Sequence, residues 1–277
     1  MKQLTKDFKL ILLLVFISTY TCISVKANTK DTLNVLLIGD STTNQWTPRT
    51  IHPERLTLEQ KISTIFNANS KTVKINTYNS SQGGETALSL FTSGRYRRDV
   101  KTYMNKNISY IFVRYGINDF YKCENVKKEF PVNLNNLIDS LKTDFPSSKI
   151  VLCTISPFIG KKSDHKINKY IKRIEKERNL LFLDVYTPFK KAMDRDGKHS
   201  YSVRMGELDD IPMEYHEWLK PYTYWLDWAK KNYVILDDNS LDYIFDKTKG
   251  WYNAHPNSAG YSIIAKTTAD YLLNLYK

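Results

Sequence analysis

Short hydrophobic runs alternate along the chain with stretches of helical periodicity. Five runs are compact enough for buried β-strands, and they cover residues 33–39, 73–78, 108–115, 149–155 and 180–185. Apolar residues at helical spacing lie between these runs, and a last helix is expected over about 257–276. Strands separated by helices indicate parallel β-α-β units. The pattern therefore predicts an α/β fold, a three-layer α/β/α sandwich around a five-stranded parallel sheet.

Residues from about 194 to 250 break this alternation and are rich in aromatic side chains. We expect them to form an insertion within a single domain over 28–277, because so short a segment buries little core of its own. Trp218, Tyr222 and Trp225 have helical spacing. They either pack the insertion onto the sandwich or form a wall on which a sugar ring stacks.

The N-terminus carries the features of an export signal. Three lysines precede an apolar run over residues 10–17, and small and polar residues follow up to Ala27. The run is short for a bilayer span, so a non-cleaved anchor is the less favoured interpretation. We therefore expect residues 1–27 to be a signal peptide, the protein to be secreted or periplasmic, and no stable membrane insertion after the signal is removed.

The chain is basic, with a formal net charge of +12. Residues 1–27 hold four lysines and one aspartate, so the mature chain would still carry +9. Such a charge suits an anionic partner, but no nucleic-acid motif is present, and we expect no nucleic acid. Cys123 and Cys153 would remain after processing, and they either form a disulfide in an oxidising compartment or stay free. The oligomeric state stays open.

Residues with catalytic potential follow three of the predicted strands and precede the last helix. Ser41 comes just after Gly39, where a hydroxyl at a strand end is well placed for nucleophilic attack. Gly84 lets the backbone approach a ligand and expose an N–H, and the Asn118 amide can donate to an oxyanion. His255 stands where an imidazole can act as a general base. Taken singly, each residue also has a structural interpretation, as a helix cap or a turn residue.

Together these segments resemble the conserved blocks of the SGNH, or GDSL-type, hydrolases, an esterase and lipase superfamily built on a flavodoxin-like sandwich. The matching segments are Gly39-Asp40-Ser41, Asn79 to Thr86, Gly116-Ile117-Asn118-Asp119 and His255-Pro256. The resemblance implies that Ser41 is the nucleophile and His255 its base. It also implies an oxyanion hole made by the main-chain N–H groups of Ser41 and Gly84 and by the Asn118 side chain.

One position departs from the family pattern. Members usually carry an aspartate three residues before the histidine, and this chain has Tyr252 there. A main-chain carbonyl near Trp251 or Tyr252 holding the imidazole is the explanation we prefer, because it preserves the histidine tautomer. Alternatively, Asp242 or Asp246 of the insertion replaces the acid, or the protein is catalytically weak.

The sequence thus predicts a secreted serine esterase that hydrolyses acyl esters, in the first place acetyl esters, on a carbohydrate or another small ester. The carbohydrate rests on the export signal, the basic charge, the aromatic insertion and the acetylesterases of the family. A lipid esterase, an O-acyltransferase and a carbohydrate-binding relative without turnover are the alternatives. The chain has no HExxH motif, no Cys/His cluster and no nucleotide-binding glycine motif, so we expect neither a metal nor a cofactor.

Overall fold

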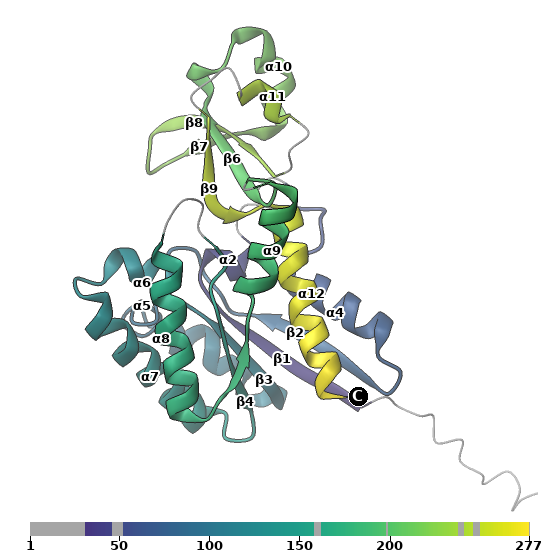
Figure 1. Ribbon diagram of the computed structural model, residues 1–277, viewed down its shortest axis with the longest axis vertical. Coiled ribbons are helices and arrows are strands. Elements are labelled where there is room, and N and C mark those ends of the chain that lie inside the picture. The colour runs from purple at the N-terminus through teal and green to yellow at the C-terminus, as the bar shows by residue number, and fades with distance from the viewer. Residues whose placement is uncertain are drawn as a thin grey trace, which may run out of the picture. The chain divides into compact units, whose positions relative to one another are not determined.

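Five parallel strands form the larger sheet of the protein, in the order β2-β1-β3-β4-β5 (Figure 1). A computed structural model describes residues 31–45, 52–157, 162–197, 199–237, 241–245 and 250–276, so the expected signal peptide lies outside the described residues. The strands are β1 (Asp31–Gly39), β2 (Val73–Asn79), β3 (Ile108–Arg114), β4 (Lys149–Cys153) and β5 (Leu181–Leu183). The predicted α/β fold with a five-stranded parallel sheet is confirmed.

The helices occupy the connections between these strands and between later segments. The α-helices are α2 (Ser41–Asn44), α4 (Leu58–Asn69), α5 (Ser89–Thr92), α6 (Ile117–Lys122), α7 (Val126–Asp144), α8 (Ser163–Arg178), α9 (Tyr186–Asp196), α10 (His216–Leu219), α11 (Asp242–Phe245) and α12 (Ser258–Leu275). A π-helical turn, η1 (Tyr96–Val100), and short 3-10 turns complete them, namely η2 (Lys101–Lys106), η3 (Leu208–Asp210), η4 (Met213–Tyr215) and η5 (Lys220–Tyr222).

Side chains of the larger sheet alternate between two buried cores. Leu36 and Ile38 of β1 face the core formed with α7 and α8, whereas Val35 and Leu37 face the core formed with α4, α9 and α12. Figure 1 shows α7 and α8 on one side of the sheet and α4 and α12 on the other. Because successive side chains of a strand point to opposite faces, a strand covered on both faces is apolar throughout. This is the predicted three-layer sandwich.

The chain segment between α9 and α12 forms a second sheet, which the hydrophobic pattern did not predict. Its four antiparallel strands have the order β7-β8-β6-β9 and are β6 (Ser202–Glu207), β7 (Thr223–Leu226), β8 (Lys231–Leu236) and β9 (Trp251–Pro256). Two hydrophobic clusters lie in this segment, one around Val203 and Tyr233 and the other around Val234 and Phe245. That the segment is an insertion in a single domain stays a prediction.

The aromatic residues of this segment differ in exposure. Tyr222 packs against both clusters, and its ring lies 6.1 Å from that of His52. Trp218 and Trp225 are 64% and 57% exposed. Packing therefore accounts for Tyr222 and does not account for the two tryptophans.

Both remaining cysteines are free thiols, so the disulfide left open by the sequence is not formed in this structure. Cys153 is buried in β4, and burial raises the pKa of its thiol to about 12. No helix in the described part of the chain is both long enough and apolar enough to cross a membrane.

Candidate active site

Ser41 is the first residue of α2, which begins directly after β1. Asp40 caps this helix, because its carboxylate accepts hydrogen bonds from the Thr42 main-chain N–H at 2.9 Å and from the Thr42 hydroxyl at 2.7 Å. A Cβ at Gly39 would lie 2.7 Å from the main-chain oxygen of Arg114, so only glycine permits the chain to turn this close to β3. The N–H of Ser41 has no partner within the helix, as is usual for a first helical residue.

His255 meets this serine from the second sheet. Its Nε2 lies 2.7 Å from the Oγ of Ser41, which is a hydrogen-bonding distance. The pairing of β6 with β9 is irregular here, since residues 202–204 of β6 oppose residues 252–256 of β9. The extra residues form a bulge, and a bulge bends a strand and redirects its side chains. His255 therefore reaches the serine from an irregular stretch of β9.

A second contact ties α12 to Ser41. Tyr261 is fully buried, and its hydroxyl donates to the main-chain oxygen of Ser41 at 3.1 Å. Asn257 caps α12, with its Oδ1 accepting from the Gly260 N–H at 3.0 Å. Because His255 comes just before this cap, the start of α12 fixes the imidazole and the serine relative to each other.

Burial lowers the pKa of His255 to about 4. Removal from water penalises the charged imidazolium, whereas a carboxylate at hydrogen-bonding distance would raise the pKa. The imidazole is therefore neutral at pH 7 and can accept a proton from a hydroxyl.

Gly84 lies in the loop after β2 and Asn118 in the first turn of α6, and a hydrogen bond joins the two segments. The Asn118 Nδ2 donates to the main-chain oxygen of Glu85 at 3.0 Å. Gly84 has a φ of 74°, in the left-handed region that favours glycine. A Cβ built at Gly83 would lie 3.8 Å from the Cβ of Ser41, so this loop passes beside the serine. An amide nitrogen carries two hydrogens, and the second N–H of Asn118 can therefore serve a ligand.

The structure thus brings Ser41 and His255 into direct contact and joins the segments of Gly84 and Asn118. Of the two candidate acids, Asp246 and the side chain of Asp242 lie outside the described residues.

Buried polar residues that support these segments could not be recognised in the sequence. Arg114, at the end of β3, is 4% exposed. Its guanidinium donates to the main-chain oxygen of Thr42 and, at 3.0 Å, to the hydroxyl of Thr43. Arginine is usually exposed, so a single sequence carries no signal that this one is buried under α2.

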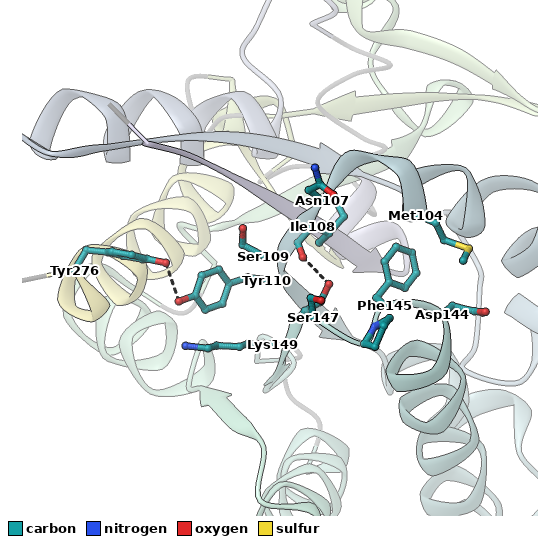
Figure 2. A pocket seen from close by; sticks show the side chains of 12 residues that line it. Met104, Asn107, Ile108, Ser109, Tyr110, Asp144, Phe145, Ser147, Lys149 and Tyr276 are labelled. Atoms are coloured by element: carbon teal, nitrogen blue, oxygen red, sulfur yellow. Dashed lines mark hydrogen bonds between the residues drawn. The ribbon is translucent and has the colours of Figure 1, made fainter. Parts of the chain in front are cut away.

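Nothing in the described part of the chain groups three or more His, Cys, Asp or Glu side chains that could hold a metal ion. A cavity of about 470 Å³, shown in Figure 2, lies where β3 and β4 begin, with Ile108, Lys149 and Tyr276 in its wall. Ser41 and Asn118 instead follow the carboxyl ends of strands. The cavity is therefore at the opposite edge of the sheet and does not belong to this site.

Comparison with protein-family models assigns the chain to a family. The model of the GDSL-like lipase/acylhydrolase family matches residues 35–268, and the chain belongs to this family. The protein is therefore a carboxylic ester hydrolase by family, and the resemblance of its sequence blocks is confirmed. A comparison with curated proteins found no match.

Solved structures share the fold. A protein described as a GDSL-like lipase from Parabacteroides merdae is 16% identical, with a TM-score of 0.53 over 87% of this chain and 95% of that one. An acetylxylan esterase from Geobacillus stearothermophilus is 17% identical, with a TM-score of 0.53 over 86% of this chain and 93% of that one. Structures of that esterase include catalytic mutants in which a serine, an aspartate or a histidine is replaced by alanine.

Proposed function

We propose that the protein is a secreted serine esterase that removes acyl groups, in the first place acetyl groups, from a carbohydrate. The observation that carries this proposal is the 2.7 Å contact between Ser41 Oγ and His255 Nε2. A hydroxyl paired with a neutral imidazole is the arrangement that activates a serine nucleophile.

In the proposed reaction, Ser41 Oγ attacks the ester carbonyl carbon and its proton passes to His255 Nε2. The N–H groups of Ser41 and Gly84 and the second N–H of Asn118 stabilise the tetrahedral oxyanion. The intermediate collapses, and the leaving alkoxide takes the proton from His255. Water then attacks the acyl-enzyme carbonyl carbon and gives a proton to His255. As the second intermediate collapses, the bond to Ser41 Oγ breaks, Oγ takes that proton from His255, and the acid is released.

A main-chain carbonyl that orients His255 is the preferred substitute for the missing aspartate. The bulge in β9 supports it, since residues in a bulge leave the regular ladder of main-chain hydrogen bonds. Carbonyl groups just before His255 can therefore face the ring.

Two observations support a carbohydrate ester as the substrate. The acetylxylan esterase named above shares the fold, and Trp218 and Trp225 offer exposed rings of the kind that stack on sugars. Export is part of the same proposal, with cleavage after Ala27. The mass of protein recovered outside the cell should then correspond to a chain that begins at Asn28.

The test is hydrolysis of p-nitrophenyl esters of increasing acyl length and release of acetate from acetylated xylo-oligosaccharides. We expect turnover that is fastest for acetate and absent in Ser41→Ala. Ser63→Ala is the matched control, because Ser63 is a half-buried serine on α4 whose hydroxyl donates to that of Thr77 at 2.8 Å. Turnover in folded Ser41→Ala, or none in the wild type, would refute the proposal, and a preference for long acyl chains would favour a lipid esterase.

A further inference from the structure

A buried group of polar side chains lies beneath the loop that carries Gly84. Glu85, Arg95 and Tyr115 are 4%, 4% and 1% exposed, and none of them takes part in the proposed reaction. Burying a carboxylate and a guanidinium is costly unless they pair and every polar atom finds a partner. These three side chains join the loop from Ser80 to Glu85 to the end of β3.

Arg95 clamps both ends of the loop. Its Nη2 donates to the main-chain oxygen of Ser80 at 2.6 Å, and its Nη1 donates to the two carboxylate oxygens of Glu85 at 3.3 and 3.4 Å. Its Nε bonds Asp99 at 2.9 Å, which orients the guanidinium from behind. The planar guanidinium presents its N–H donors in a fixed fork, so one side chain can set the span from Ser80 to Glu85.

Tyr115 ties the same carboxylate to the end of β3. Its hydroxyl donates to Glu85 Oε2 at 2.6 Å. Asn118 follows three residues later, and its Nδ2 donates to the main-chain oxygen of Glu85 at 3.0 Å. The Glu85 carboxylate therefore binds Tyr115, while the Glu85 main-chain oxygen binds the Asn118 amide. Gly84 directly precedes Glu85 in the chain.

We propose that Glu85, Arg95 and Tyr115 are positioning residues that hold the Gly84 N–H and the Asn118 amide at the spacing an oxyanion requires. This inference rests on the proposed function, since it assigns a support to the proposed oxyanion hole. Donors of this kind act in the transition state, where small displacements are costly. Loosening the support should lower kcat and leave KM nearly unchanged.

The first test compares two conservative substitutions. Tyr115→Phe removes only the hydroxyl bound to Glu85. Tyr96→Phe is the matched control, because Tyr96 is 5% exposed and its hydroxyl donates to a carboxylate oxygen of Asp144 at 2.9 Å. We expect similar losses of thermal stability, and a fall in kcat of about tenfold, with KM within about twofold, in Tyr115→Phe only.

The second test is a double-mutant cycle with Asn118→Ala. If Tyr115 acts through the oxyanion donors, the effect of Tyr115→Phe should be clearly smaller in the Asn118→Ala background than in the wild type, because only the Gly84 donor is left to displace. Arg95→Lys keeps the charge and loses the fork, so it should lower kcat in the same non-additive way. Arg95→Lys also provides the test if Tyr115→Phe does not fold.

The outcomes separate this inference from the proposed function. Normal wild-type turnover and a large loss in Asn118→Ala, with Tyr115→Phe and Arg95→Lys behaving like Tyr96→Phe, would overturn the positioning role alone. Effects that multiply with Asn118→Ala, or that appear in KM and not in kcat, would overturn it too. Absence of wild-type turnover would overturn the proposed function and the positioning role together.

Discussion

The two halves of the candidate site are held in different ways. Ser41, Gly84 and Asn118 follow strands of the five-stranded sheet, and buried charged residues hydrogen-bond to their loops. His255 comes from β9 of the second sheet, and burial is what shifts its pKa. Ionic hydrogen bonds thus fix the half that carries Ser41, whereas the bulge, the start of α12 and exclusion of water shape the half that carries His255.

This difference indicates where the departure at Tyr252 matters. An aspartate beside the histidine would stabilise the imidazolium that forms during the reaction. An imidazole with a pKa of about 4 is fully in its neutral form at pH 7 but is a weaker base than an ordinary imidazole. The departure at Tyr252 should therefore affect proton transfer and leave the contacts of Gly84 and Asn118 unchanged.

The largest expected effect is removal of the base. His255→Ala should lower kcat by about 10⁴-fold or more, since Ser41 then has no proton acceptor. Turnover is measured with p-nitrophenyl acetate. His216→Ala is the control, because His216 contacts the main-chain oxygen of Ile211 and not a serine. A loss below about tenfold in folded His255→Ala would mean that another group takes the proton.

Loss of one proposed oxyanion donor should have a smaller effect. Asn118→Ala should lower kcat by about 10²- to 10³-fold, the usual scale for one such donor. Asn135→Ala is the matched control, since the Asn135 amide also donates to a main-chain oxygen, that of Pro131 at 2.9 Å. A change below about threefold would make Asn118 a turn residue.

The acid limb of the pH profile should distinguish the burial of His255 from an ordinary imidazole. With a pKa of about 4, kcat/KM should fall only as the pH drops toward 4, because the base must be neutral. An ordinary imidazole, with a pKa of about 6.5, would already lose about tenfold at pH 5.5.

The control for this profile is Asp119→Asn. Burial raises the pKa of Asp119 to about 7, so its own titration could add a limb in that range. A limb near 6.5 that persists in Asp119→Asn would contradict the account of His255.

The smallest expected effects concern the candidate acids. If a carbonyl orients the imidazole, Asp242→Asn and Asp246→Asn should each change kcat by less than about threefold, against about 10⁴-fold for the loss of a triad acid. Unfolding curves must show that both variants are folded. A steep loss in one of them would restore a complete triad.

The larger sheet could be predicted from sequence because each of its strands is a separate hydrophobic run. The second sheet could not. Its strand β6 pairs with β9 across about fifty residues of chain. No local periodicity encodes such a pairing or its bulge. The predicted position of His255 before the last helix was correct, but its place in a strand was missed.

The candidate site was predictable as a set of blocks and not as a geometry. Ser41, Gly84, Asn118 and His255 stand out because they follow or precede recognisable elements. Arg95 does not, because it precedes Arg97 and Arg98 in a run that is typical of a solvated face. Its burial depends on packing among segments that only the folded chain brings together.

The most direct test of the central claim is covalent labelling of the folded protein with diethyl p-nitrophenyl phosphate. The account predicts that each molecule releases one p-nitrophenolate and gains one diethylphosphoryl group, which peptide mass spectrometry locates on Ser41, and that His255→Ala reacts far more slowly. A label on another residue, or no label on the folded wild-type protein, would contradict it.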